Sequence, residues 1–515
     1  MARKVIRNTV FNSVGRIWTM VFAFLLTPFV VEHLGEERYG IWALVFVIVG
    51  YFGTFDFGIG VSFTKYVAQY HAQHNHKAVN ALATSGLGFY LVLSTALIAG
   101  TAAFSSQILG LFHMPATMLE EARFVLSVAV LSLCLSNVAN IFEAIINGLQ
   151  HMEVTNLITL VVSVPQVIGT ILVLNLGYGL RGLIFIRVFV VGSSLVLLAI
   201  WAYRLLPSLR LRPQAFRSDR LRQLLQYGAP IQITTLGALI NLHVNKAFLG
   251  YFLGLRFITF YDLGFKVVYT VVSLPLLLVS AILPAASELD ARLDKVLLDQ
   301  IYTRGSKYIV LTAAPLAVFV ILNAPRLMST WMGAEYPESV QVVRILSGSF
   351  FINLLTAPGT SVARGIGRPW YEAQYAILTG LIHIGLALIL IPTWGFIGAL
   401  VAAFLGTTVG SAYFLYLFHR HMEKSFARFA AQIYLKPIVA CAVAGVAVYL
   451  LNLAVDWPLP LPGRWNGLFY LTVSGAIFLG LYVIVIWWLD YLDSYDRTLI
   501  ARGGHEAIFS RTSEV

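Results

Sequence analysis

Long apolar stretches follow one another along almost the whole chain and are separated by short polar connections. A helix needs about 20 apolar residues to cross a bilayer, and about fourteen stretches meet this requirement. Their centres lie near residues 20, 48, 94, 135, 165, 193, 239, 270, 317, 350, 382, 407, 445 and 478. The pattern predicts an all-α polytopic membrane protein with about fourteen transmembrane helices.

Composition and charge support this fold class. The chain is 58% hydrophobic and 11% charged, whereas about a quarter of the residues of a soluble domain are charged. Its net charge is +11. In membrane proteins such an excess of Lys and Arg collects in the cytoplasmic loops, so we expect no nucleic-acid partner. With the N-terminus in the cytoplasm, most basic residues fall at the inner face, which predicts that both termini are cytoplasmic. One loop alone contains Arg204, Arg210, Arg212, Arg217, Arg220 and Arg222.

Short motifs recur at an offset of roughly 217 residues, which predicts two parallel halves around a central cavity. The pairs are "HLGEERYGIW" with "FLGLRFITFY", "NGLQ" with "RGIG", and "YGLRG" with "WGFIG". We expect a six-helix lobe, a basic amphipathic linker on the inner leaflet, a second lobe, two additional helices and a cytoplasmic tail. Their ranges are 1–205, 206–226, 227–420, 421–490 and 491–515. The linker's arginines either bind acidic lipid or only set the topology.

Polar side chains form stripes inside several predicted spans. A lipid-facing helix is apolar, whereas residues three or four apart share one helical face. The candidate cavity-lining amides are Asn12, Asn137, Asn140, Asn241 and Asn353. The alternative for each is hydrogen bonding between helices.

Charged residues inside the spans are stronger candidates, because a charge in the membrane is costly and often functional. They are Arg16, Asp56, Glu143, Arg187, Lys246, Asp262, Lys266 and Arg344. Arg16 and Lys266 are the expected cavity cations, while Asp56, Glu143 and Asp262 are candidates for gating or ion coupling. Two alternatives stay open: Asp262 and Lys266, four residues apart, form an ion pair within one helix, and Arg187, Lys246 and Arg344 extend to the outer surface.

The stretch "YFGTFDFGIGVSFTKYVAQY", residues 51–70, places Asp56 among three glycines near the cytoplasmic end of the second span. The glycines allow the helix to bend or neighbours to approach. Asp56 is therefore either a gating or coupling carboxylate or a capping residue.

No catalytic or metal-binding motif is present, so we expect no enzyme, metal or cofactor. Cys134 and Cys441 lie in apolar runs without a metal-ligand spacing, and we expect them to pack in the core. His243 and His383 are isolated histidines, for which packing is favoured over proton relay.

The segment "LGEERYGIWALVFVIVGYFGTFDFGIGVSFTKYVAQY", at 34–70, resembles the N-terminal signature of the polysaccharide transporters. These are the O-antigen and oligosaccharidyl-lipid flippases of the superfamily that contains the multidrug and toxin exporters (MATE) and the lipid II flippase. "LPLLLVSAILPAASELDARLDK", at 274–295, resembles a segment of their second half. The resemblance implies a two-lobed fold of twelve to fourteen helices in the bacterial cytoplasmic (inner) membrane.

The resemblance also implies a function in surface polysaccharide and lipopolysaccharide biosynthesis. An oligosaccharide linked to undecaprenyl pyrophosphate would move to the outer face by alternating access, with H⁺ or Na⁺ and polysaccharide-assembly proteins as expected partners. Arg16 and Lys266 match the lipid II flippase's cations in span position, whereas Tyr51 and Phe52 stand where that relative has arginines.

Three other functions remain open. A MATE-type cation or drug antiporter would share the fold but needs a carboxylate-rich cavity, whereas this chain has more intramembrane cations than anions. A membrane-embedded polysaccharide polymerase or ligase would need a long outer loop, and no connection is that long. A non-transporting scaffold would not explain the intramembrane charges.

Overall fold

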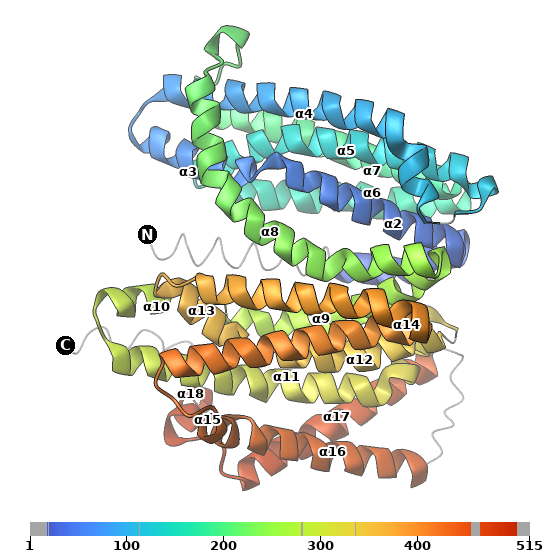
Figure 1. Ribbon diagram of the computed structural model, residues 1–515, viewed down its shortest axis with the longest axis vertical. Coiled ribbons are helices and arrows are strands. Elements are labelled where there is room, and N and C mark those ends of the chain that lie inside the picture. The colour runs from blue at the N-terminus through green and yellow to red at the C-terminus, as the bar shows by residue number, and fades with distance from the viewer. Residues whose placement is uncertain are drawn as a thin grey trace. The chain divides into compact units, whose positions relative to one another are not determined.

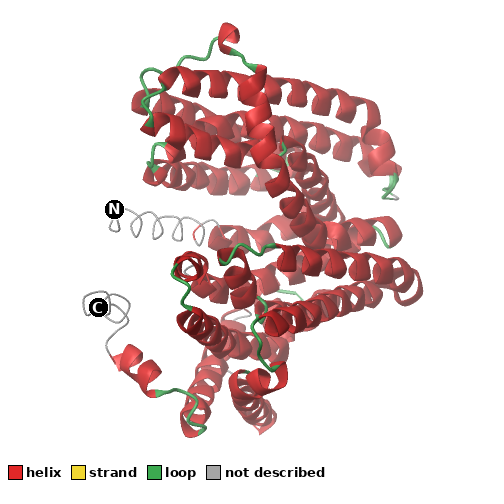
Figure 2. Cartoon of the chain, turned by 60° about the vertical axis from the view of Figure 1, so that its left-hand side comes forward, coloured by secondary structure: helices red, strands yellow, loops and turns green. Residues whose placement is uncertain are grey.

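The computed structural model describes residues 18, 20–112, 114–279, 282–334, 336–454 and 464–501. Throughout these residues the regular elements are helices, as Figure 2 shows. The all-α prediction is therefore confirmed for the described part of the chain. Arg16 and Asn12, two of the predicted cavity residues, lie outside it.

The described chain falls into two compact units. The first comprises residues 1–262 with 387–399. Its helices are Met20–Leu34, α2 (Glu36–Gly53), α3 (Ile59–Ala72), α4 (His76–Gly110), α5 (Ala116–Gly148), α6 (Met152–Asn175), α7 (Gly179–Leu205) and α8 (Ser218–Phe252), with the 3₁₀ turns η1 (Thr54–Asp56) and η2 (Pro213–Ala215). α5 packs along α4 and α7, and α6 packs along α7 (Figure 1).

The second unit comprises residues 263–386 and 400–515. The boundary therefore falls inside α9 (Leu255–Val279), after Asp262. The later helices are α10 (Ile282–Ala291), α11 (Lys295–Met332), α12 (Pro337–Leu354), α13 (Ala357–Gly365), α14 (Trp370–His421), α15 (Phe426–Ile433), α16 (Leu435–Ala454), α17 (Arg464–Trp488) and α18 (Ser494–Ala501). The proposed lobe boundaries stay a prediction.

Each of the fourteen predicted span centres lies in a helix. In the described residues, 10 helices are long and apolar enough to cross a membrane, or up to 11 if the bent pair of α15 with α16 is one span. Met20–Leu34 is shorter than this requirement, and α8 is not among the 10. The count of fourteen spans and the location of the termini therefore stay predictions.

Two of the predicted spans, centred near 382 and 407, are the two arms of α14, which a kink separates. The backbone leaves helical geometry at Gly395, where φ is 58° and ψ is −135°. Beyond this kink the two arms approach closely: a Cβ on Gly406 would lie 2.9 Å from the His383 Cβ, and one on Gly410 would lie 1.9 Å from the Thr379 Oγ1. Small residues allow such close helix contacts in membranes, so these glycines explain why the arms fold against each other.

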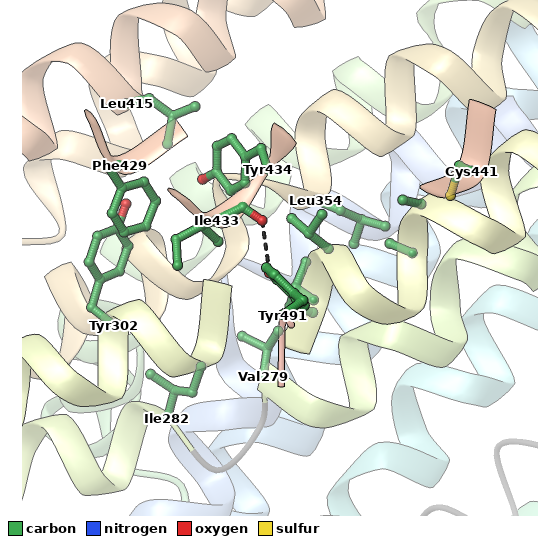
Figure 3. Close-up of a cluster of buried hydrophobic side chains, with 14 of the residues drawn as sticks. Val279, Ile282, Tyr302, Leu354, Leu415, Phe429, Ile433, Tyr434, Cys441 and Tyr491 are labelled. Atoms are coloured by element: carbon green, nitrogen blue, oxygen red, sulfur yellow. Dashed lines mark hydrogen bonds between the residues drawn. The ribbon is translucent and has the colours of Figure 1, made fainter. Parts of the chain in front are cut away.

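The cores of both units consist of apolar side chains between helices. In the first unit, one cluster gathers around α3, α4 and α5, and another around α2, α5 and α7. In the second unit, α11, α14, α15, α16 and α17 share a cluster with Tyr302 stacked on Phe429 at 5.2 Å (Figure 3). The Tyr491 hydroxyl donates to the Ile433 carbonyl at 2.8 Å within this cluster (Figure 3). The connection after α17 is thus fixed to the second unit.

The basic linker is a loop that binds α4 and then continues as α8. Asn80 donates to the Ser208 carbonyl at 2.9 Å and accepts from the Arg210 backbone N–H at 3.1 Å. Ser85 exchanges a similar pair of hydrogen bonds with the Arg217 backbone, at 3.0 and 2.9 Å. The sequence leads us to expect an amphipathic segment over 206–226, whereas the structure has a clamped loop up to Arg217 and regular helix from Ser218. Lipid binding by this loop stays a prediction.

Candidate functional site

A buried network of three polar side chains joins α2, α8 and α9 in the first unit. The Asp262 carboxylate accepts from the Lys246 Nζ at 2.5 Å and from the Tyr39 hydroxyl at 2.7 Å. Asp262 is 6% exposed and Lys246 is 7% exposed. The network therefore places a charged pair inside the protein. Its aspartate lies in a helix that is long and apolar enough to cross a membrane.

Further contacts hold the start of α9 against α2. The Thr259 hydroxyl donates to the Glu36 carbonyl at 2.6 Å, and Arg256 forms an ion pair with the Glu36 carboxylate. Gly40 lies so close to α9 that a Cβ there would be 2.3 Å from the Leu255 carbonyl oxygen. The first two turns of α9 are thus fixed to α2 by side chains, backbone and a required glycine.

The energetics of the Asp262 pair favour a role beyond simple stabilisation. Desolvating two charges often costs as much as their attraction returns, so apolar replacements of similar volume are commonly neutral or stabilising. A buried pair in a membrane helix is also expensive relative to the apolar alternative. The pair is therefore a candidate for a gate or an ion-coupling element.

Sequence reasoning identified Asp262 and Lys246 but paired neither correctly. It considered Lys266 as the helical partner of Asp262 and an outward extension of Lys246 toward the surface. In the structure Lys246 is buried and bonded to Asp262, so the alternative in which it extends to the surface is wrong. Tyr39 was missed, because a tyrosine at a predicted helix start gives no signal of a distant partner. Lys266 lies in α9 and is partly buried.

Asp56 shapes the break between α2 and α3. Its carboxylate accepts the Gly58 backbone N–H at 2.7 Å, while Phe57 and Gly58 adopt left-handed φ values of 52° and 71°. A Cβ on Gly58 would lie 2.4 Å from the Gly228 carbonyl oxygen, so only glycine fits this approach. The glycines were expected to allow a bend or a close approach, and the structure has a break between α2 and α3 here. The geometry matches the capping alternative for Asp56, and its gating role stays a prediction.

The predicted polar stripe on α5 is present in part as an accessible face. Asn140 and Glu143 are partly buried, and the Asn147 side-chain oxygen accepts from Thr155 at 3.1 Å. Asn137 is 4% exposed, and its Nδ2 has no partner in the described residues. Asn137 therefore packs inside the unit, while Asn140 and Glu143 are partly exposed.

In the second unit, Asn353 connects α12 to α14. Its amide Nδ2 donates to the Tyr375 hydroxyl, and its backbone carbonyl accepts from Thr356 at 2.7 Å. Asn241 belongs to α8, but its side chain lies outside the described part of the chain. The convergence of Asn353, Lys266 and the first-unit residues on one cavity stays a prediction.

Arg187 is an intramembrane cation of a different kind. It lies about 12 Å along α7 from Gly179, at about 1.5 Å per residue. Its Nε has no hydrogen-bond partner in the described residues, and its guanidinium carbon is 5.8 Å from the Phe46 ring centre. A central membrane arginine costs about 2.5–3.5 kcal/mol, while a cation–π contact returns about 0.5–2 kcal/mol. The ring contact therefore offsets only part of the cost.

Metal and thiol chemistry find little support in the described residues. No group of three His, Cys, Asp or Glu side chains there is placed to hold a metal ion. Cys134 and Cys441 are free and buried, as the sequence predicted.

Comparison with known proteins places this architecture in a known group. Residues 5–290 match the family described as polysaccharide biosynthesis protein. A Shigella flexneri protein named as an O-antigen transporter is 20% identical over 406 residues, which cover 77% of this chain and 94% of that protein. A Haloferax volcanii protein named as a low-salt glycan biosynthesis flippase is 19% identical over 296 residues, or 58% of this chain and 60% of that one.

Solved structures share the fold. The inward closed lipid II flippase MurJ superposes with a TM-score of 0.75 at 14% identity, covering 94% of this chain and 100% of that one. An inward-facing MATE multidrug transporter of the MOP superfamily superposes with a TM-score of 0.71 at 15% identity, covering 78% of this chain and 94% of that one. The chain therefore has the fold of this superfamily.

Proposed function

The chain belongs to the polysaccharide biosynthesis protein family, and on this premise we propose that it is a flippase for a lipid-linked oligosaccharide. The carrier is undecaprenyl pyrophosphate, and transport proceeds by alternating access in the bacterial cytoplasmic membrane. The relatives are named as a transporter and a flippase, which favours transport over catalysis.

The observation that carries this proposal is the set of charged and amide side chains within helices that are otherwise apolar. The buried Lys246–Asp262 pair and the accessible Asn140 and Glu143 are the described members of this set. Sugars and pyrophosphate cannot enter hydrocarbon without polar partners. A polar interior surrounded by apolar helices supplies such partners while the polyprenyl chain stays in the lipid.

Each candidate residue has a proposed role. Arg16 and Lys266 bind the pyrophosphate through charge-assisted hydrogen bonds. The amides, which bind sugar hydroxyls, are Asn12, Asn140, Asn241 and Asn353, whereas Asn137 packs inside the first unit. Asp262 acts in gating or ion coupling through its bonds to Lys246 and Tyr39. Asp56 and Glu143 act at the other end of the pathway.

A drug antiporter of the MATE type is the second candidate, because such a transporter shares the fold. Organic cations need accessible carboxylates. In the first unit the Asp262 carboxylate is already bonded to a lysine, and Arg187 adds a cation. These charges favour an anionic ligand.

The test is a flipping assay in proteoliposomes with a fluorescent polyprenyl-pyrophosphate oligosaccharide. Wild type is compared with Arg16→Ala and Lys266→Ala, and a fluorescent organic cation is the competing cargo. We expect wild type to move the oligosaccharide and both variants to lose at least tenfold in rate, which equals the loss of about 1.4 kcal/mol of interaction. Transport of the organic cation instead of the oligosaccharide would overturn the proposal.

A further inference from the structure

Arg187 lies on the face of α7 that points into the first unit. Its neighbours one turn away, Leu183, Val190 and Val191, are 5%, 6% and 8% exposed. Residues three and four apart share a helical face. The exposed aliphatic and aromatic side chains lie on the opposite side of α7, at Phe185, Phe189, Val196, Ile200 and Tyr203. An arginine that extended toward lipid headgroups would lie on that opposite side, so Arg187 faces the protein interior.

No carboxylate in the first unit balances this charge. All Asp and Glu residues of that unit are described, because residues 1–17, Thr19 and His113, which are not described, include none. Among the described residues, Arg187 forms no ion pair, whereas Arg181, six residues earlier on the same helix, pairs with Glu120 at 3.8 Å. Asp262 is bonded to Lys246 and Tyr39. The buried Nε of Arg187 is without a partner in these residues.

Arg187 as a whole is only partly buried, so its side chain is not sealed inside the first unit. It lies beside Phe46, on the side of α2 where Trp42, Phe46 and Gly50 are all partly exposed. A Cβ on Gly50 would meet nothing within 4 Å. Arg187 therefore lies next to partly exposed positions of α2, in the half of α7 nearer to Gly179.

We infer that Arg187 is an anion-binding residue that takes a phosphate or pyrophosphate group of the lipid-linked substrate, and this inference rests on the proposed function. The guanidinium offers five N–H donors in a planar fork that matches phosphate oxygens. A bound phosphate supplies the missing negative charge. With the topology expected from the sequence, this half of α7 is the outer one, so Arg187 holds the phosphate near the end of its path.

The experiment measures binding of polyprenyl pyrophosphate to the full-length protein in detergent, with polyprenol as the neutral control lipid. Arg187→Gln removes the charge, and Arg181→Gln on the same helix is the matched control. Losing a hydrogen bond to a charged group weakens binding by about tenfold to a hundredfold. We expect this loss for Arg187→Gln with pyrophosphate alone, and less than a twofold change for Arg181→Gln.

Thermal unfolding without lipid separates binding from a structural role. A cation without a partner is not needed for folding, so we expect Arg187→Gln to unfold at or above the wild-type temperature. Wild-type affinity in Arg187→Gln would overturn the inference. Equal loss of polyprenol binding, or a variant that is destabilised or does not fold, would also overturn it by assigning Arg187 a structural role.

The parallel flipping assay distinguishes this inference from the proposed function. If wild type does not move the oligosaccharide but binds pyrophosphate through Arg187, the anion site stands and the flippase proposal fails. If wild type moves the oligosaccharide and Arg187→Gln binds and moves it equally well, the flippase proposal stands and the anion site fails.

Discussion

Two aspartates in different units each bind a lysine and a tyrosine. Asp262 accepts from Lys246 and Tyr39 in the first unit, with the Tyr39 hydroxyl at 2.7 Å. Asp496 accepts from Lys307 and from the Tyr308 hydroxyl at 2.7 Å in the second unit. The two aspartates are 6% and 2% exposed, so both charges are buried.

The surroundings of the two aspartates differ. Asp496 belongs to a reciprocal cap at the start of α18: its backbone N–H donates to Asp493 at 2.8 Å, and its carboxylate accepts the Asp493 backbone N–H at 3.1 Å. Arg304 lies 3.9 Å from the same carboxylate. α18 is a short helix that is not a membrane-span candidate. Asp262 instead lies inside α9, a helix long and apolar enough to cross the membrane.

This difference separates an anchoring pair from a candidate transport element. The bonds of Asp496 fix a terminal helix to α11, and its carboxylate also satisfies a helix end. A charge inside a membrane helix serves no helix end, and an apolar pair would stabilise the same contact at lower cost. The same three residue types therefore have different significance in the two units.

Asp262→Asn should give the largest loss of stability. It leaves the Lys246 ammonium buried without its counter-charge, and breaking a buried pair costs about 3–5 kcal/mol. Denaturant unfolding in detergent measures this loss. The double variant Lys246→Met with Asp262→Leu should recover wild-type stability or exceed it, and a double variant as unstable as the single one would contradict this view of the pair.

Asp496→Asn should have a smaller global effect, about 2–3 kcal/mol, because an amide retains part of the cap and Lys307 has Asp493 at 3.7 Å. The change should release α18, which limited proteolysis detects as faster cleavage after α17. Asp490→Asn is the matched control, since its pair with Arg497 is exposed and is worth less than about 1 kcal/mol. Equal protection of α18 in wild type and Asp496→Asn would show that the carboxylate does not anchor the helix.

Tyrosine-to-phenylalanine changes compare the two networks one bond at a time. Tyr39→Phe removes a buried donor from Asp262 and should cost about 1–3 kcal/mol. Tyr308 is partly exposed, so water replaces its hydrogen bond and Tyr308→Phe should cost about 0.5–1.5 kcal/mol. Chemical unfolding of both variants gives the order, and a larger cost for Tyr308→Phe would reverse the comparison.

Lowering the pH should weaken the attachment of α18, and this is the smallest effect that we predict. Burial alone would raise the pKa of Asp496, but hydrogen bonds from Lys307, Tyr308 and the Asp493 backbone hold it below the ordinary value of 3.8. A lowered pKa means that the stabilisation is complete above pH 3.8 and is lost as the pH falls through the lower folded-state value. Amide hydrogen exchange in α18, corrected for the intrinsic effect of pH, should therefore stay constant from pH 7 to about 4 and increase below. Faster corrected exchange already between pH 7 and 5, absent from Asp496→Asn, would contradict the assignment.

Apolar periodicity predicted the helices well but not the exact positions of their breaks. All fourteen predicted centres lie in helices, because a long apolar stretch has few alternatives in a membrane. Two separate spans were predicted around residues 382 and 407, so a break between them was expected, whereas its position at Gly395 and the close packing of the two arms required the fold. α8 contains a predicted span but is not among the 10 described helices that are apolar enough to cross a membrane, because its polar side chains lower its mean hydropathy.

The candidate site was only partly predictable. Intramembrane charge identified Asp262 and Lys246, but their sequence separation of 16 gives no indication that they bond. The nearer Lys266, one turn along the helix, was the natural partner from sequence. Asp56 was identified together with its glycines, and its bond to Gly58 is local enough to be expected from an Asp–x–Gly turn. Long-range pairs such as Tyr39 with Asp262 require the fold.

The most direct measurement is the rate of oligosaccharide flipping, per amount of folded and inserted protein, in two double variants. One replaces the first pair, as Lys246→Met with Asp262→Leu, and the other replaces the second pair, as Lys307→Met with Asp496→Leu. The account predicts that the first variant loses at least tenfold in flipping rate while the second stays within about twofold of wild type. Full transport by the first variant, or an equal loss in both, would contradict the assignment of Asp262 to transport and Asp496 to anchoring.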